Sequence, residues 1–167
     1  MDKHKPPAED WALELMRDFQ DKITCGLYDA IYHLDQGSVE TLMRAQAHSC
    51  VGAFLELGTL RTPMSLDAFL DAMRIAGPSQ INIEREGNVI HWSEQHDGQC
   101  VCPFVRRRVV RLDPKLCLCG AHWVKELFRT VTHTEVDVEI LDTAATGARN
   151  CSFLITVQGP PDRVEMH

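Results

Sequence analysis

The sequence contains no apolar run of the roughly 20 residues that a membrane-spanning helix needs. Its first residues, 1–7, also lack the apolar core of a signal peptide. Positive charge is scarce: 17 Lys and Arg stand against 24 Asp and Glu, which gives a net charge of −7. Proteins that bind the phosphate backbone of nucleic acids concentrate positive charge instead. These absences predict a soluble, cytoplasmic protein that binds neither membranes nor nucleic acids.

Familiar catalytic motifs are missing as well. The chain has no Gly-rich phosphate loop, no Gly-x-Ser-x-Gly elbow and no His-Glu-x-x-His helix, so we assign no catalytic and no cofactor-binding residue. The one dense basic run is Arg106 to Arg108, followed by Arg111. On a strand these side chains would alternate between faces, which favours a solvated edge over a nucleic-acid patch.

Apolar residues recur every three or four positions through the first half of the chain, which predicts about three helices. The first carries a stripe of side chains spaced by four, at Trp11, Leu15, Phe19, Ile23, Leu27 and Ile31. Ser38 and Ser65 are suitable N-caps for the second and third helices, and Gly77-Pro78 is expected to stop the third. The stripe of the first helix fits either an interface with a second copy, giving a homodimer, or packing inside the chain.

The period then changes to two, which is typical of strands. A hairpin is predicted over residues 81–92, a third strand over 100–112, and two more strands over 136–140 and 151–157, with one further helix from Asp113-Pro114 to Val131. The predicted fold is therefore α+β, a helical layer packed on an antiparallel sheet of four to five strands. We expect a leader (1–8), one domain (9–158, helical over 9–77 and cysteine-containing over 80–158) and a tail (159–167).

Seven cysteines in a chain with no signal peptide would stay reduced in the cytosol, which favours metal binding or thiol reactivity over disulfides. Four of them form two Cys-x-Cys pairs, Cys100 with Cys102 and Cys117 with Cys119. The first pair begins the predicted third strand, where residues two apart point to one side. The second pair straddles a helix start, whose dipole favours thiolates. The four are predicted to bind zinc, with a redox dithiol as the alternative.

The other candidate side chains divide between core and site. Cys25 and Cys50 lie on or beside helical apolar stripes, which favours the core for both. Cys151 follows a turn on a strand and is either a core residue or an alternative ligand. His122 lies three residues beyond Cys119, which makes it an alternative ligand or an ordinary surface histidine.

The second half of the chain also resembles a known family. Cys117, Gly120, Trp123 and Phe128, followed by a strand ending at Glu139, then Gly147, Cys151 and Phe153, resemble the 4-vinyl-reductase-like domain over roughly residues 80–157. The resemblance implies a small-molecule-binding module related in fold to trafficking-complex subunits. In aromatic-compound sensors of this family, a zinc is held by the first Cys, an acidic strand residue and two later cysteines.

Carried over to this chain, the resemblance implies Cys119 or Cys117 as the first ligand, Glu139 or Asp142 as the carboxylate and Cys151 as the last ligand. The remaining ligand has no cysteine here, because residues 142–145 read Asp-Thr-Ala-Ala. The segment Cys100-Val-Cys102-Pro103 also resembles uncharacterised short bacterial proteins with this motif before a Cys-x-Cys helix. We therefore favour the two pairs, with Cys151, Glu139 and His122 as alternatives.

Two functional hypotheses follow. The first is a ligand-binding or sensory module in which Met, Phe and Leu side chains line an apolar pocket between helices and sheet, and a zinc bound by the cysteines clamps strand to helix. The second is an enzyme, a metal-dependent or cysteine-dependent hydrolase or redox protein that uses the same cysteines. The incomplete catalytic constellation favours the binding module.

Overall fold

The computed structural model describes residues 8–58, 60–76 and 80–159. The predicted leader and tail lie outside the described residues except for Ala8 and Gly159, and so does the predicted helix stop at Gly77-Pro78. The elements in chain order are α1 (Ala8–Ile31), α2 (Gln36–Glu56), α3 (Leu66–Ala76), β1 (Gln80–Glu86), β2 (Val89–Gln95), α4 (Pro103–Arg106), α5 (Pro114–Thr132), β3 (Val136–Asp142), the 3-10 turn η1 (Ala144–Thr146) and β4 (Asn150–Val157). The predicted α+β class is confirmed.

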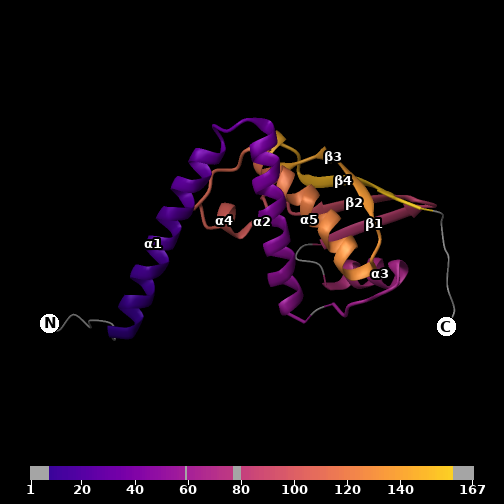
Figure 1. The fold of residues 1–167 in the computed structure, drawn as a ribbon, viewed down its shortest axis with the longest axis horizontal. Coiled ribbons are helices and arrows are strands. Elements are labelled where there is room, and N and C mark those ends of the chain that lie inside the picture. Colours follow the sequence, from indigo (N-terminus) through magenta and orange to yellow (C-terminus); the bar gives the residue numbers. More distant parts are fainter. Residues whose placement is uncertain (1–7, 59, 77–79, 160–167) are drawn as a thin grey trace.

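The strands form one antiparallel sheet in the order β1-β2-β4-β3 (Figure 1). β1 and β2 are the predicted hairpin, in which Glu86 pairs with Val89 across the turn. β4 pairs with β2 so that Phe153 lies opposite Trp92, and β3 completes the sheet beyond β4. Because side chains alternate along a strand, Trp92 and Phe153 point to the same face. Both are buried, so this is the core face of the sheet.

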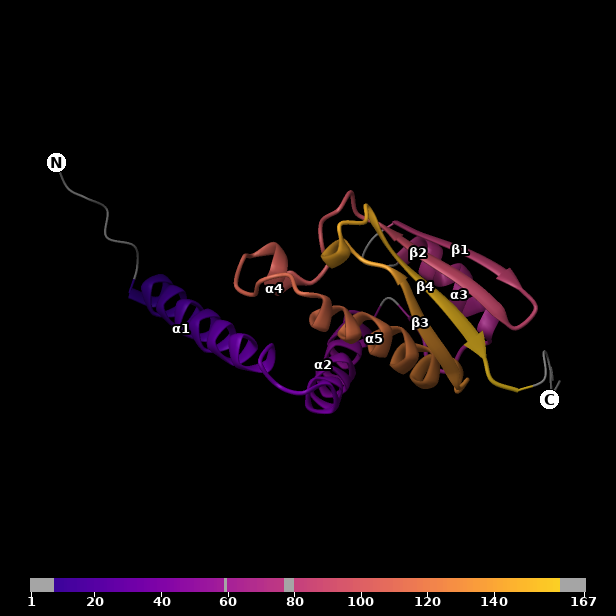
Figure 2. The same ribbon diagram turned by 90° about the horizontal axis from the view of Figure 1, so that it is seen from above.

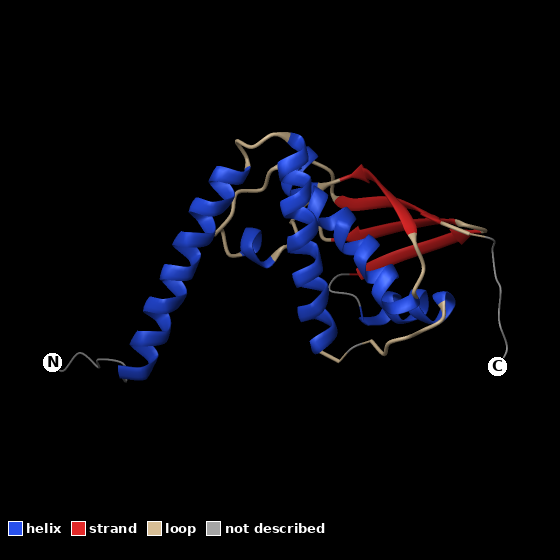
Figure 3. Cartoon of the chain, in the orientation of Figure 1, coloured by secondary structure: helices blue, strands red, loops and turns tan. Residues whose placement is uncertain are grey.

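Helices cover the core face in two steps, as the ribbon and the cartoon show (Figures 1 and 3). α5 packs against β3 and α3 against β1, while α2 packs against α5. Phe69 of α3, Trp92 of β2 and Phe128 of α5 are buried and meet in the centre, with the ring centroids of the two Phe residues 4.9 Å apart. The opposite face of the sheet carries exposed polar side chains such as Glu84 and His91.

The predicted third strand over residues 100–112 is wrong. This stretch holds the short helix α4 between two loops. Pro103 begins α4, a position at which the missing N–H of proline costs no hydrogen bond. Arg108 adopts a left-handed φ of 59°, and the chain turns back so that Val109 N donates to Phe104 O at 2.8 Å. The arginine run therefore follows a helical turn and not the alternating faces of a strand.

α1 projects away from the rest of the molecule, as the turned view shows (Figure 2). Its last turn is anchored by Tyr28 and Ile31, each 4% exposed, which belong to a second apolar cluster with residues of α2, α5 and the segment 104–110. The predicted helix is confirmed, but of the side chains on its apolar stripe only Ile31 is buried. Six large side chains on it are more than half exposed: Trp11, Leu15, Met16, Phe19, Ile23 and Leu27. No described helix combines the length and the hydropathy that crossing a bilayer takes.

Candidate functional site

Six of the seven cysteines gather in one region, close enough for their charges to interact. They are Cys50 of α2, Cys100 and Cys102 of the loop before α4, Cys117 and Cys119 of α5, and Cys151 of β4, and all six are half-buried free thiols. The seventh, Cys25, is exposed on α1, where its thiol donates to Asp29 Oδ2 at 3.8 Å. The predicted core position of Cys25 is therefore wrong, because that side of α1 faces solvent.

The first thiol group comprises Cys50, Cys102 and Cys119. A hydrogen bond from the Cys119 thiol lowers the pKa of Cys50 to about 6, against the opposing effect of burial. Gln46 Nε2 donates a second hydrogen bond to Cys50 Sγ at 3.2 Å. The same contact with Cys50, together with burial, raises the pKa of Cys119. The contact thus favours negative charge on Cys50 over Cys119, the opposite of what the position of Cys119 near the helix start predicts.

The second thiol group comprises Cys100, Cys117 and Cys151, with the carboxylate of Glu94 beside them. Glu94 pairs with Cys151 across β2 and β4, so both side chains lie on the core face. Burial raises the pKa of Cys100 to about 11, and the neighbouring Cys102, Cys151 and Cys117 add to the rise. Burial also raises the pKa of Cys151, to which Glu94 and Cys117 add. Burial thus disfavours negative charge at Cys100, Cys151 and Glu94.

The two Cys-x-Cys pairs are divided between these groups, one member of each pair going to each group. Cys117 and Cys119 both lie inside α5, and residues two apart on a helix do not share a face. The sequence predicts instead that this pair straddles the start of the helix, where the helical twist would not separate the two thiols. The structure brings all four predicted cysteines into one region but pairs Cys119 with Cys50, which sequence reasoning had placed in the core. Nothing in the spacing of α2 points to that contact.

Glu94 is the residue at this site that sequence reasoning missed. It is 5% exposed, accepts a hydrogen bond from Trp92 Nε1 at 3.1 Å, and has its pKa raised by burial. The predicted hairpin strand stops at Trp92, but β2 continues to Gln95. Extending the alternation of Ile90 and Trp92 by one step would have placed Glu94 on the core face. Just beyond it, both ring nitrogens of His96 are buried without a hydrogen-bond partner in the described chain.

The metal prediction can be compared with the arrangement of these donors. Among the residues that the structure describes, no three His, Cys, Asp or Glu side chains are placed to hold a metal ion together. The second thiol group with Glu94 does fit zinc in the kind and number of its donors, three sulfurs and one carboxylate. A cysteine side chain turns about a single torsion between staggered positions, so rotation about χ1 re-aims its sulfur.

The other predicted ligands lie apart from the cysteines. Glu139 is exposed and pairs with Leu154, which is three residues from Cys151 on β4, so Glu139 points to the opposite face of the sheet. Asp142 is exposed at the end of β3. The His122 imidazole faces α2, with Nε2 3.8 Å from Glu40 Oε1, and burial lowers its pKa.

A hollow of about 390 Å³ lies between α2, α5 and β3, and we call it the helix-side hollow. Four apolar and four charged or titratable side chains line it: Leu118, Ala121, Val138 and Ile140, and Glu40, His122, Lys125 and Asp137. Lys125 Nζ lies 3.4 Å from Asp137 Oδ1, which forms one ion pair on its rim. Leu118, which lines the hollow, lies between Cys117 and Cys119 on α5, so the hollow adjoins the cysteine region. The hollow therefore offers an apolar surface flanked by positively and negatively charged groups.

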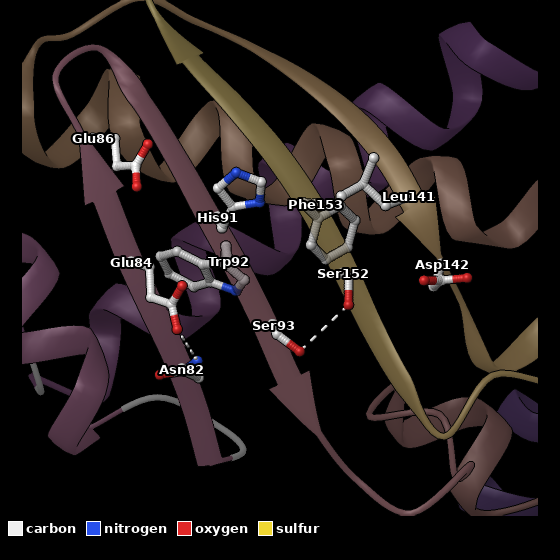
Figure 4. A pocket seen from close by; sticks show the side chains of 10 residues that line it. All are labelled: Asn82, Glu84, Glu86, His91, Trp92, Ser93, Leu141, Asp142, Ser152 and Phe153. Carbon is white, nitrogen blue, oxygen red and sulfur yellow. Dashed lines mark hydrogen bonds between the residues drawn. The ribbon is translucent and has the colours of Figure 1, made fainter.

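A second hollow, also of about 390 Å³, lies on the open face of the sheet (Figure 4). Its polar side chains include three carboxylates, Glu84, Glu86 and Asp142, with His91 among them. Across its middle, Ser152 Oγ donates to Ser93 Oγ at 3.3 Å. This sheet-face hollow is more polar than the helix-side hollow and suits an apolar ligand less.

The enclosed apolar pocket expected between the helices and the sheet is occupied by the protein's own core. Phe69, Met73, Trp92 and Phe128 fill that space and are each at most 1% exposed. Protein interiors pack as densely as organic crystals, so side chains in contact leave no room for a ligand of drug size. A small molecule would therefore bind at a surface hollow.

No protein-family model matches the sequence, and no curated protein matches it. Among solved structures, the chain is similar to a trafficking protein particle complex subunit 3 from Naegleria fowleri covalently bound to palmitic acid, at 8% identity over 87% of this chain and 99% of that chain, with a TM-score of 0.51. The likeness is one of fold. It agrees with the fold relationship to trafficking-complex subunits that the sequence resemblance implies.

Two further solved structures are similar at TM-scores below 0.5. The phenol-responsive sensory domain of the transcription activator PoxR, solved with phenol, has a TM-score of 0.49 at 16% identity over 83% of this chain and 72% of that chain. A vinyl-4-reductase family protein from Methanocaldococcus jannaschii has a TM-score of 0.40 at 9% identity over 95% of this chain and 85% of that chain.

Proposed function

We propose that the protein is a small-molecule-binding module and that its ligand occupies the helix-side hollow. The observation that carries the proposal is the composition of that hollow, in which Leu118, Ala121, Val138 and Ile140 provide apolar surface beside charged side chains. Ligand sites are concave, mostly apolar and supplied with a few polar groups that fix orientation, and a volume of about 390 Å³ lies in their usual range. The fold relative that carries palmitic acid supports an apolar ligand for this architecture.

The charges on the rim define the ligand class further. Lys125 is paired with Asp137 at 3.4 Å, and both side chains are partly exposed, at 44% and 68%. Exposed ion pairs of this kind contribute little to stability, so replacing Asp137 by another carboxylate beside Lys125 costs little free energy. A molecule with an apolar body and one carboxylate could therefore lie on the apolar surface and take the place of Asp137 beside Lys125.

Octanoate has this chemistry and serves as the probe. In a nuclear magnetic resonance titration of the full chain, we expect saturable shifts of the backbone amides of Leu118, Ala121 and Val138. Ala121→Trp should abolish the shifts because its ring fills the hollow, whereas the matched control Ala53→Trp, at an exposed position of α2, should preserve them. Shifts that never saturate, or that Ala121→Trp leaves unchanged, would refute the proposed site.

Within this module, we propose that the second thiol group and Glu94 bind a zinc ion. Cys100 and Cys117 come from the two predicted pairs, Cys151 is the predicted alternative, and Glu94 adds a carboxylate. Zinc would offset the repulsion among groups whose burial disfavours negative charge, since a coordinated thiol is deprotonated by the cation itself. The ion would hold the loop before α4, the start of α5 and the start of β4 together, next to the helix-side hollow.

Metal analysis of protein purified without added metal tests this assignment. We expect about one zinc per chain, reduced strongly by Cys151→Ser and by Glu94→Gln and unchanged by the control Cys25→Ser. Retention of zinc in Cys151→Ser together with its loss in Cys50→Ser would instead place the ion in the first thiol group. A metal-free protein would refute the zinc assignment and leave the hollow to be tested by octanoate alone.

One observation favours a second candidate function, a cysteine-dependent enzyme. The pKa of Cys50, about 6, makes it a thiolate at neutral pH, the form in which cysteine is nucleophilic. An enzyme of this class would be purified without metal and would lose activity toward an electrophilic substrate in Cys50→Ser. The binding module predicts no such activity.

A further inference from the structure

The apolar stripe of α1 lies on the side of the helix that faces away from the rest of the protein. Phe19, at the middle of the stripe, and Tyr28, at the anchored end, are nine residues apart, which is two and a half turns and places them on opposite sides. Tyr28 is 4% exposed and Phe19 is 64% exposed. An amphipathic helix normally turns its apolar side to the core, so this stripe is arranged for contact with another molecule.

The amount of exposed apolar surface is large for a free chain. Trp11 and Phe19, which are 58% and 64% exposed, and the four aliphatic side chains of the stripe together present on the order of 600 Å². The largest apolar patch of a typical monomer covers about 300–600 Å². A stable interface needs about 800 Å² from each partner, so the stripe supplies most of one side of such an interface.

The order of residues along the stripe matches itself when reversed. Leu15 and Ile23 each lie four residues from Phe19, and Trp11 and Leu27 each lie eight residues from it. In an antiparallel pair of α1 helices centred on Phe19, Trp11 thus faces Leu27 and Leu15 faces Ile23 of the other copy, while Met16 lies opposite Lys22. This is the self-complementarity that a twofold interface requires, because the same surface serves on both sides.

Charge favours a second copy in this orientation over other occupants. α1 carries two basic residues, Arg17 and Lys22, and six acidic ones, whereas helices that lie on membranes are rich in Lys and Arg. In a parallel pair, like charges at the same positions of the two helices, such as Glu14 and Asp18, would lie at the same level and repel each other. The antiparallel pair separates them.

We propose that the protein is a homodimer in which two copies of α1 pair antiparallel through this stripe, with the two Phe19 side chains at the twofold axis. The rest of each chain then lies on the outer side of its own helix, because Tyr28, and Asp21 through its ion pair with Arg107, hold α1 from the side opposite Phe19. In this dimer each copy keeps its own cysteine region and its own helix-side hollow, and the two copies are joined through the pair of α1 helices.

Sedimentation equilibrium of the full chain tests the assembly. We expect twice the chain mass of 18.9 kDa, with a dissociation constant at or below about 1 µM. Phe19→Glu should give a monomer whose circular dichroism is that of a folded protein, because the side chain is exposed in the free chain. Ile75→Glu is the matched control: Ile75 is 89% exposed on α3, away from the stripe, and its replacement should leave the dimer intact.

Cysteine crosslinking tests the orientation. In a Cys25→Ser background, a mixture of Leu15→Cys and Ile23→Cys chains should form an interchain disulfide on oxidation, while neither variant alone should do so. Crosslinking of Leu15→Cys with itself would overturn the antiparallel register. A monomer at all concentrations would overturn the dimer, whether or not it sediments with phosphatidylcholine vesicles.

Discussion

Glu94 is the side chain at which burial and charge conflict most directly. It lies on the core face between Ile81 of β1 and Cys151 of β4, and its one hydrogen bond, from Trp92, does not offset its desolvation. In the metal-free protein the carboxyl group is therefore held more easily as the neutral acid than as the anion. The same residue is a ligand in the proposed zinc site, where the cation would remove this conflict.

The raised pKa of Glu94 has a consequence for stability. A carboxyl whose folded-state pKa exceeds its unfolded value of 4.5 stabilises the fold below that value, and the contribution is lost as pH rises through the folded-state pKa. Glu94→Gln keeps the acceptor for Trp92 and removes the charge. In chelator-treated protein we expect it to increase the free energy of unfolding at pH 8 by on the order of 1 kcal/mol, with no gain at pH 4.

Urea unfolding at the two pH values measures this difference. Glu86→Gln, at an exposed position of β1, is the control and should change stability little at either pH. A gain of equal size at both values would mean that packing, and not ionisation, separates glutamine from glutamate at position 94.

Cys50 is predicted to be the fastest-reacting thiol of the metal-free chain. Its pKa of about 6 gives it a midpoint of alkylation by iodoacetamide near that pH, read by mass spectrometry of the labelled peptide. Cys119→Ala removes the donated hydrogen bond and should move the midpoint toward the ordinary value of 9.0. Cys25→Ser should leave it in place. A midpoint for Cys50 that stays the same in Cys119→Ala would show that the thiol pair does not set its pKa.

At the scale of elements, the regular helices were predictable and the irregular segment was not. The i, i+4 pattern identified α1, and the capping residues Asp113 and Ser65 mark the starts of α5 and α3, each accepting a hydrogen bond from the first turn. The segment 103–110 contains the β-branched valines typical of a strand, but Pro103 begins a helical turn there and no neighbouring strand pairs with it in the described chain. Local composition alone does not reveal whether such a segment forms a strand or a helical turn.

The candidate site was predictable in its membership but not in its pairing. The two Cys-x-Cys motifs predicted that their four cysteines lie close together, and the structure brings them into one region. Which thiol meets which depends on how α5 is rotated against α2, and the contact of Cys50 with Cys119 joins residues 69 positions apart. Such tertiary contacts leave no signal in the local sequence.

Two glycines at the C-terminal part of α2 should respond oppositely to the same substitution. Gly52 is inside the helix, and a methyl group there meets no atom within 4 Å, so Gly52→Ala should stabilise the protein by about 0.8 kcal/mol through helix propensity. Gly58 follows the helix with a φ of +71°, which costs a non-glycine residue about 1 kcal/mol or more. Gly58→Ala should therefore destabilise the protein, as chemical unfolding of both variants would show. Effects of the same sign would contradict the assigned end of α2.

At the scale of the whole molecule, the chain is held together by two apolar clusters of different roles. The larger one joins α3 and α5 to the sheet, and the smaller one attaches the last turn of α1 to α2, α5 and the segment 104–110. Tyr28 belongs to the smaller cluster, where its ring centroid lies 6.4 Å from that of Phe104. The position of α1 depends on this cluster alone among the apolar contacts described.

The distinction between anchored and exposed residues of α1 can be measured. Tyr28→Ala should lower the free energy of unfolding by about 3 kcal/mol because it leaves a cavity in the smaller cluster. Phe19→Ala, at concentrations low enough for the chain to be monomeric, should change it by less than about 0.5 kcal/mol. Denaturant titrations followed by tryptophan fluorescence compare the two. A large loss from Phe19→Ala in the monomer would mean that the stripe packs within its own chain.

Lys115 connects the junction between α1 and α2 to the cysteine region. Its Nζ donates to the carbonyl oxygens of Tyr32 and Leu34, at 2.7 and 3.0 Å, where α1 gives way to α2. Lys115 lies in the first turn of α5, two residues before Cys117. Among the contacts described, α1 is held from Asp21, which pairs with Arg107, to the buried Ile31, and residues 8–20 extend beyond them as an arm about 20 Å long. Because Lys115 binds the junction between α1 and α2, a change in the angle between these two helices would act on the start of α5, next to Cys117.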